Sequence, residues 1–242
     1  MFHRCVRICH SLYFCLNTII RKHFVHLHET VHLVLDHGSG HPGILRDAFL
    51  MKHTMTEKEK MLAGLVYSAV DEKLLKELNE VKDIIHKYNS LMPSASQERF
   101  AILKGLLGHT ADDEFIINQP FYCDYGKQIS IGKRFFANFN LTILDEAPVA
   151  IGDDCFIGPN VSIYTACHST DPIERNTRQE WAEPVKIGDN VWIGGSVTIL
   201  PGVTIGNNVT IGAGSVVTRC IPDNVVAAGN PCKIIKDISI KK

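Results

Sequence analysis

The chain has 242 residues, a hydrophobic fraction of 45% and a formal net charge of −1 at pH 7. This length can bury a substantial core, while the near-zero charge gives no bulk attraction to nucleic acid or to a membrane surface. No apolar run reaches the roughly 20 residues that a membrane helix needs, so neither partner is expected. The eight cysteines include no CxxC pair, which favours free thiols in a reducing compartment, and we expect a cytoplasmic location.

Residues 1–54 differ in composition from the rest of the chain. They hold nine of the twelve histidines, and no acidic residue precedes Glu29. The run LYFCLNTII has the length of a signal-peptide core but lacks a small-residue cleavage site after it, and a transit peptide would contain more serine. The cysteine spacing matches no standard zinc pattern. We expect a disordered extension or a non-native start, with Met51 and Met55 as alternative starts, and we assign it no function.

Residues 55–110 carry a helical pattern. In DEKLLKELNEVKDIIHKY, apolar residues recur at three- and four-residue steps, which predicts one amphipathic helix. Pro93 predicts its end at Met92, because the residue before a proline disfavours helical geometry. Ser94 and Gln97 resemble a capping box that would begin a second helix through FAILKGLLG. We expect a small packing cap, and a lid over a site is the alternative.

From about Ile129 the period changes to six residues. The aliphatic residues that share this spacing are Ile151, Ile157, Ile163, Ile187, Ile193, Ile199, Ile205, Ile211 and Val217. A six-residue period is typical of hexapeptide parallel β-helices, in which three hexads form one coil of a prism. The predicted fold class is therefore mainly β, with a β-helix over residues 111–238 and a small N-terminal α-helical cap.

One insertion interrupts the hexads. Ile163 and Ile187 are 24 residues apart, a whole number of hexads, so the prism is expected to resume in phase after a loop at about 169–184. Cys167 falls on an inward position of the repeat. By strand alternation His168 should point outward, at the rim from which the loop leaves.

His168 is the only histidine after His109, which limits the chemistry of the prism. A catalytic zinc site of the hydratase type needs about three histidines, so we expect no metal. A serine hydrolase of the GxSxG type is excluded because that motif is absent. A lone histidine with a pKa near 6.5 can serve as a general base. The alternative is that His168 only hydrogen-bonds the loop to the prism.

Several motifs occur together and in order along residues 56–238. They are FYCDYGKQISIG, FFANFNLTILD, YTACHSTDPIERN, KIGDNVWIGGSVTILPGVTIG and IPDNVVAAGNPCKII. With them the chain resembles the maltose/galactoside O-acetyltransferase family of hexapeptide-repeat acyltransferases, and the maltose branch most closely. The resemblance implies left-handed coiling, against the usual crossover rule. It also implies acetyl transfer from acetyl-CoA to a sugar hydroxyl by direct attack, without an acyl-enzyme.

The resemblance also implies roles for individual residues. His168 would be the general base, and the acceptor would bind Asp124, Asn138 and Glu146. Glu146 stands where the galactoside branch has aspartate, which puts the acceptor preference in doubt. On the acetyl-CoA side, the backbone N–H of Gly195 would be the oxyanion contact. Ala213 and Thr218 would flank the pantetheine. The residues near the phosphates would be Arg219, Lys233 and Lys236. For the three cations, ordinary solvated charge is the alternative.

The family works as a homotrimer with active sites between neighbouring prisms, so self-association is implied here. Two other functions stay open from the sequence. One is a hexapeptide acetyltransferase with a different acceptor, such as an antibiotic, a lipo-oligosaccharide or an amine. The other is a non-catalytic β-helix scaffold, against which the presence of His168, Asn138 and the VWIGG run argues.

Overall fold

A computed structural model of the chain describes residues 55–239, and the expectations for residues 1–54 lie outside the described residues. The described chain begins with α3 (Glu57–Leu62), whose capping box joins Thr56 and Glu59, followed by β1 (Tyr67–Ser68). The predicted amphipathic helix is α4 (Glu72–Ser90). Its first amides are capped by the Asp71 side chain, so its start is fixed by an ordinary N-cap.

The second predicted helix is present but its predicted cap is wrong. α5 (Ser96–Leu106) has Ala95 at its N-cap and no side-chain capping bond, because Ser94 lies one residue too early to reach the orphan amides. The preceding helix ends at Ser90, two residues before Met92.

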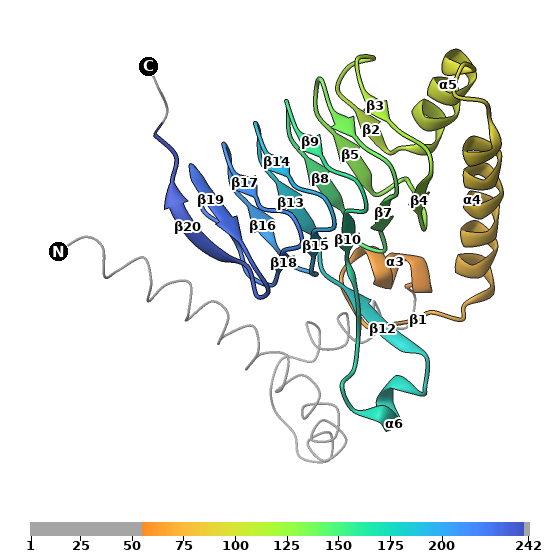
Figure 1. Cartoon of the computed structure of the whole chain (residues 1–242). Coiled ribbons are helices and arrows are strands. Elements are labelled where there is room, and N and C mark those ends of the chain that lie inside the picture. The colour runs from red at the N-terminus through yellow and green to blue at the C-terminus, as the bar shows by residue number, and fades with distance from the viewer. Residues whose placement is uncertain (1–54, 240–242) are drawn as a thin grey trace, which may run out of the picture. The chain divides into compact units, whose positions relative to one another are not determined.

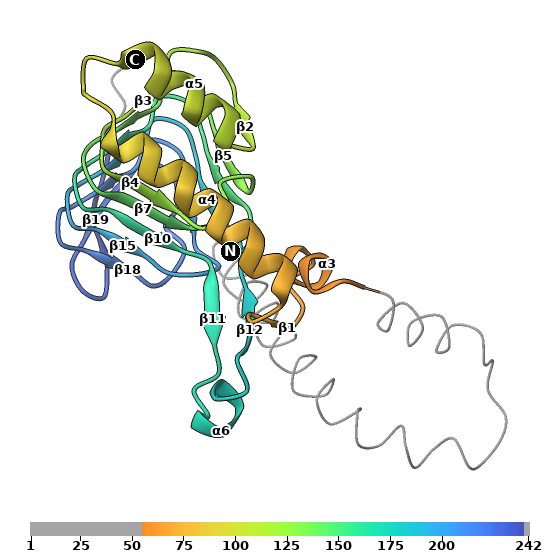
Figure 2. The ribbon, with the colours of Figure 1, turned by 90° about the vertical axis from the view of Figure 1, so that its right-hand side faces the viewer.

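Helices α4 and α5 cover one end of a stack of β-coils (Figures 1 and 2). The Asn89 side chain of α4 donates to the Phe121 carbonyl and accepts from the Phe121 N–H, both at 2.9 Å. It thus satisfies backbone groups at the open edge of the first coil, which would otherwise be an unpaired strand edge.

The coils form three parallel sheets, each named here after its first strand. The β2 sheet contains β2 (His109–Thr110), β5 (Ile129–Ile131), β8 (Val149–Ile151), β13 (Val185–Ile187) and β16 (Thr204–Ile205). The β3 sheet contains β3 (Ile116–Ile117), β6 (Phe136–Ala137), β9 (Phe156–Ile157), β14 (Trp192–Ile193), β17 (Thr210–Ile211), β19 (Val225–Ala228) and the antiparallel β20 (Lys233–Asp237). The β4 sheet contains β4 (Phe121–Cys123), β7 (Leu141–Leu144), β10 (Ser162–Tyr164), β15 (Thr198–Ile199) and β18 (Val216–Val217). The predicted fold class is confirmed, and the coils begin at His109, well before the regular hexads.

The core of the prism is a set of aliphatic ladders. Ile187 pairs with Ile151 on one side and with Ile205 on the other, and all three are at most 4% exposed. Ile163 pairs with Ile199 in the β4 sheet. The prism therefore resumes in phase after the insertion, as the 24-residue interval predicts. Each fully buried side chain of this kind contributes about 1.5–3 kcal/mol.

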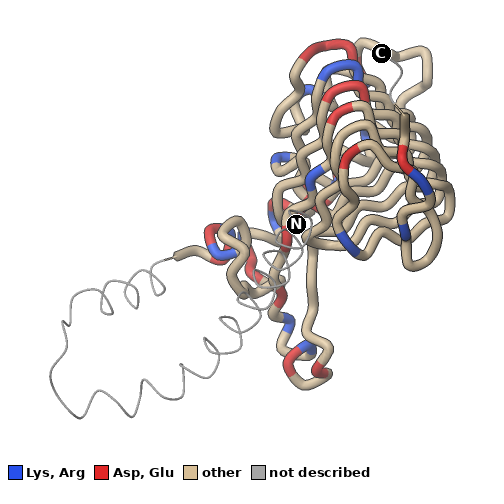
Figure 3. The backbone as a smooth tube through the Cα atoms, turned by 90° about the vertical axis from the view of Figure 1, so that its left-hand side faces the viewer, with Lys and Arg blue, Asp and Glu red and all other residues tan. Residues whose placement is uncertain are grey.

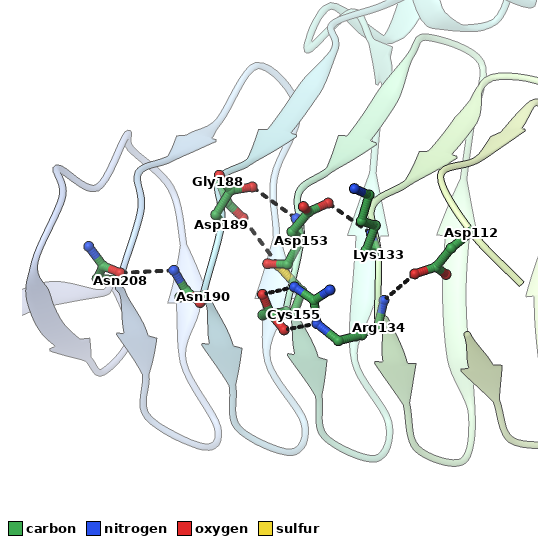
Figure 4. A network of polar contacts seen from close by, with 10 residues as sticks. Asp112, Lys133, Arg134, Asp153, Cys155, Gly188, Asp189, Asn190 and Asn208 are labelled. Carbon is green, nitrogen blue, oxygen red and sulfur yellow. Dashed lines mark hydrogen bonds and ion pairs between the residues drawn. The ribbon is translucent and has the colours of Figure 1, made fainter. Parts of the chain in front are cut away.

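One corner of the prism is held by a ladder of polar side chains. Asp153 Oδ1 accepts the Lys133 N–H, and Asp189 Oδ1 accepts the Asp153 N–H, each at 2.8 Å (Figure 4). Asn190 donates to the Asn208 side chain at 3.2 Å, and both turn residues have φ near +55°, a conformation that asparagine tolerates better than most residues. Acidic residues consequently recur on successive coils (Figure 3).

The insertion is an antiparallel hairpin. β11 (Ala166–His168) pairs with β12 (Gln179–Ala182), and the tip contains α6 (Pro172–Arg175). β1 joins β12 as a third strand, and the hairpin projects away from the coils (Figures 1 and 2). The hairpin begins at Ala166, three residues before the predicted loop. Cys167 therefore pairs with Trp181 and is half-buried, so the prediction that it occupies an inward prism position is wrong.

Candidate active site

A cluster of carboxyl groups occupies the corner after β4, β7 and β10. These strands are neighbours in one sheet, so the residues that follow them stack on successive coils. Asp145 Oδ1 accepts the backbone N–H groups of Asp124 and Tyr125 at 3.0 and 2.9 Å. Thr165 Oγ1 lies 3.2 Å from Glu146 Oε2. We call Asp124, Asp145, Glu146 and Thr165 the acid corner.

Burial changes the protonation of the acid corner. Asp145 is fully buried and its Oδ2 has no hydrogen-bond partner among the described residues. Burial raises the pKa of Asp145 to about 7, although the two N–H groups oppose the shift. Burial, and after it the hydrogen bond with Asp124, raises the pKa of Glu146 above its usual range. Glu146 therefore keeps its proton more readily than an exposed glutamate does.

The hairpin that carries His168 leaves the prism directly after Thr165, at the acid corner. His168 Nε2 lies 3.4 Å from Glu180 Oε2 on the neighbouring strand β12. The side chain of His168 is 55% exposed, whereas that of Glu180 is 11% exposed. The Tyr67 hydroxyl, from β1, donates to Glu180 Oε1. Burial and the hydrogen bond to Glu180 raise the pKa of Tyr67, so the phenol keeps its proton and remains a donor.

Asp124 also lines a cavity of about 390 Å³ between α4 and the ends of β4 and β7. Lys82 and His86 of α4 and Tyr122 of β4 line the same cavity. One face of the acid corner is thus open to a space that could hold part of a small polar molecule.

A groove of about 510 Å³ lies at a different corner, after the strands of the β3 sheet. It brings together Asn138, Gly195 and Ala213, three of the residues implied by the family resemblance. Its floor and wall include the aromatic rings of Phe156 and Trp192, which are 53% and 59% exposed. Such an open apolar channel with backbone polar groups suits an extended thioester chain.

The backbone of Gly195 faces this groove with an unused donor. No acceptor among the described residues takes its N–H, while its carbonyl accepts from Gly214 at 2.9 Å. Gly158 makes the close approach possible, since a Cβ there would lie 2.6 Å from the Gly195 nitrogen. A free, rigidly held N–H is the arrangement needed to stabilise an oxyanion.

Two lysines of β20 lie on the outer face of the β3 sheet, the sheet that carries the groove. A bulge between Val226 and Ala227 lets Lys236 pair with Val226 and Lys233 with Ala228, which are both outward positions of β19. Val226 pairs in turn with Thr210, and Thr210 with Trp192. Lys236 is therefore in line with the groove. Thr218 and Arg219 are exposed immediately after β18, at the end of the neighbouring sheet.

The structure does not bring all of the predicted residues into one place. Asn138 follows a strand of the β3 sheet, and Glu146 follows the next strand, β7. The acid corner and the groove are thus separated by the width of the β4 sheet, a span of roughly 15–20 Å for six extended residues.

Sequence reasoning missed Glu180, Tyr67 and Asp145. Glu180 and Ala182 are the buried positions of β12, so an alternating pattern in QEWA was the available signal for a strand. No local sequence pattern indicated a role for Tyr67, because its partner Glu180 is 113 residues away.

Two further observations concern residues 55–239 alone. In this part of the chain no group of three or more His, Cys, Asp or Glu side chains could hold a metal ion. No helix there is long and apolar enough to cross a membrane.

Comparison with known proteins defines the class of this fold and site. Family models match residues 184–219 as bacterial transferase hexapeptide repeats, residues 60–111 as the maltose acetyltransferase hexapeptide capping motif, and residues 148–166 as a succinyl-transferase hexapeptide repeat. The protein is a hexapeptide-repeat acyltransferase.

Relatives place the chain more narrowly. It is 54% identical to a putative acetyltransferase of Saccharomyces cerevisiae over 76% of this chain and 93% of that one. It is 40% identical to the Escherichia coli galactoside O-acetyltransferase over 76% and 91%. Among solved structures, a maltose O-acetyltransferase from Clostridium difficile 630 is similar with a TM-score of 0.75 and 49% identity, over 77% of this chain and 99% of that one. A galactoside acetyltransferase in complex with coenzyme A has a TM-score of 0.74 and 40% identity, over 77% and 92%.

The chain therefore belongs to the maltose/galactoside O-acetyltransferase family of hexapeptide-repeat acyltransferases. It is an acetyl-CoA-dependent acetyltransferase.

Proposed function

We propose that the protein transfers the acetyl group of acetyl-CoA to a hydroxyl of a sugar of the maltose, glucose or galactoside type, with His168 as the general base. The observation that carries this proposal is the position of His168 on a hairpin that leaves the prism at the acid corner. Neighbouring carboxyl groups such as those of Asp124 and Glu146 suit the paired hydroxyls of a sugar.

The proposed reaction proceeds in a ternary complex. His168 takes the proton of the acceptor hydroxyl as its oxygen attacks the thioester carbonyl, a step in which a positioned base contributes about 10²–10⁴ in rate. The Gly195 N–H donates to the developing oxyanion. Collapse breaks the carbon–sulfur bond, and the CoA thiolate takes the proton from the imidazolium, which leaves an acetyl ester and free CoA.

The remaining residues bind the two substrates in this proposal. Asp124, Asn138 and Glu146 hold the acceptor. Ala213 and Thr218 flank the pantetheine, while Arg219, Lys233 and Lys236 face the nucleotide phosphates, which attract cations and accept their hydrogen bonds. The alignment of Lys236 with Trp192, through Thr210 and Val226, supports this placement.

We further propose a homotrimer in which each active site lies between neighbouring prisms. Support comes from the separation of the acid corner and the groove by one side of the prism, since a second copy could place its groove against the first copy's acid corner. An exposed apolar row on the β3 sheet, formed by Ile116, Phe156 and Trp192, offers a surface for that contact.

The test is an acceptor panel of maltose, glucose, a galactoside, an amino sugar and an aminoglycoside, incubated with acetyl-CoA while free CoA is measured. We expect a neutral sugar to release CoA fastest, and we expect His168→Ala to lower turnover by about 10²–10⁴ while calorimetry shows unchanged acetyl-CoA binding. Full turnover by His168→Ala refutes the base assignment, and preference for an amine acceptor refutes the sugar.

A further inference from the structure

Glu180 is a buried carboxylate with an incomplete set of partners. It is 9% exposed, and one oxygen accepts from the Tyr67 hydroxyl. The other oxygen faces His168 Nε2 at 3.4 Å. Among residues 55–239, His168 is the one basic side chain within ion-pair distance of Glu180.

A buried carboxylate of this kind is costly unless it is paired and hydrogen-bonded. Basic side chains of the two helices packed against β12 are engaged elsewhere. Arg175 of α6 donates to the Ser169 carbonyl at 3.1 Å, and Lys60 of α3 is paired with Glu57 at 2.5 Å. The site therefore holds a preorganised negative charge next to His168 and compensates it with a single phenol.

We propose that Glu180, held in place by Tyr67, is a positioning residue that orients the His168 ring and stabilises its protonated form during acetyl transfer. This inference rests on the proposed role of His168 as the base. It assigns a function in the reaction to β1, because Tyr67 belongs to that strand and lies only four residues before the N-cap Asp71 of α4.

The pairing acts in two ways. The ring nitrogen that faces Glu180 keeps its proton, which leaves the lone pair on the other nitrogen for the acceptor hydroxyl. When that nitrogen takes the proton, the imidazolium forms an ion pair with Glu180. This charge exists in the transition state and not in the resting site, so the interaction accelerates the reaction instead of only tightening binding.

Among residues 55–239, a protonated His168 is the one positive partner within ion-pair distance of Glu180. Other ionisable groups gather nearby, namely Tyr67 from β1, Tyr125, and Glu146 from the acid corner. Both tyrosines lie within electrostatic reach of Glu180 and Glu146. All of them are acids, so none supplies the positive charge that would replace His168 as the partner of Glu180.

The experiment compares Glu180→Gln, Tyr67→Phe and the double variant in the full chain, with acetyl-CoA and the best acceptor from the panel. Glu180→Gln should lower kcat by about 10- to 100-fold with little change in KM. Glu180→Asp, which keeps a carboxylate at this position, should retain more of kcat than Glu180→Gln. Tyr67→Phe should lower kcat less, and should add little in the Glu180→Gln background, because Tyr67 acts only through Glu180.

Glu174→Gln is the matched control, since Glu174 is an exposed carboxylate of the same hairpin that bonds to Ser169. Melting temperature and acetyl-CoA binding are measured for every variant, and Tyr67→Phe keeps the proposal testable if Glu180→Gln does not fold. A normal kcat in Glu180→Gln, equal losses in Glu180→Asp and Glu180→Gln, or fully additive losses in the double variant would each overturn the positioning role. His168→Ala separates the two ideas: if it is inactive while Glu180→Gln is normal, only this inference fails.

Discussion

Gly158→Ala is the substitution by which the role of the Gly195 N–H can be tested most directly. A Cβ at residue 158 would lie 2.6 Å from the Gly195 nitrogen and 2.8 Å from the Gly194 carbonyl carbon. Both are backbone atoms, so no flexible side chain can move aside. Ordinary contact begins near 3.4 Å, and the nitrogen must therefore shift by about 0.8 Å (3.4 − 2.6).

A shift of this size should impair catalysis strongly. A misplacement of about 1 Å in a catalytic group can cost about 10² in rate, and loss of one oxyanion donor costs about 10²–10³. We expect kcat of Gly158→Ala to fall by about 10². Overpacking of this kind should also lower the free energy of unfolding by about 1–3 kcal/mol.

Gly188→Ala provides a matched control for the stability effect. Its Cβ would lie 2.6 Å from the Asn207 Oδ1 atom and 2.8 Å from the Gly206 carbonyl carbon, but the site is at the polar corner ladder and outside the groove. Both variants should lose similar melting temperature in thermal denaturation, and only Gly158→Ala should lose CoA release. If Gly158→Ala is destabilised like Gly188→Ala yet retains the normal kcat, the Gly195 N–H is not the oxyanion donor.

Three other predictions follow from single residues. Asp145→Asn should flatten the pH dependence of the free energy of unfolding. Between pH 4 and about 7 native Asp145 holds a proton that the unfolded chain has lost, so the free energy of unfolding of the wild type falls by up to about 1.4 kcal/mol per pH unit as pH rises. Denaturant titrations that give the variant and the wild type the same slope against pH would contradict this. Gly105→Ala in α5, where a Cβ meets nothing within 4 Å, should stabilise the protein by about 0.5–1 kcal/mol, and an unchanged or lowered melting temperature would count against it. Lys236→Ala should raise the KM for acetyl-CoA roughly five-fold, an effect of about 1 kcal/mol that weakens with salt. The control Lys73→Ala, at an exposed position of α4, should leave this KM unchanged, and equal KM values for the two variants would refute the phosphate contact.

Local sequence was a good guide where structure depends on near neighbours. The helix over residues 72–90 follows from its apolar stripe, and the ladders of the prism follow from the six-residue period. It was a poor guide to helix boundaries: the Ser94 capping box failed because the chain turns into α5 one residue later, at Ala95. A cap depends on backbone dihedral angles that residue type only biases.

The site could be predicted in pieces. The motifs around Asn138 and Gly195 predict acetyl transfer, and the single His168 predicts a general base. No local pattern shows that Lys233 and Lys236 share a face. Strict alternation would place them on opposite faces, and the bulge opposite Val226 and Ala227 reverses that expectation.

The prism follows from the six-residue period, because this period repeats identical short-range geometry in every coil and stays in phase across the 24-residue interval. The surroundings of His168 follow only from long-range packing. Glu180 reaches it through antiparallel pairing across the hairpin, and Tyr67 through the pairing of β1 with β12. Such contacts join residues that are far apart in the chain, and their partners are selected by the folded packing and not by the residues beside them.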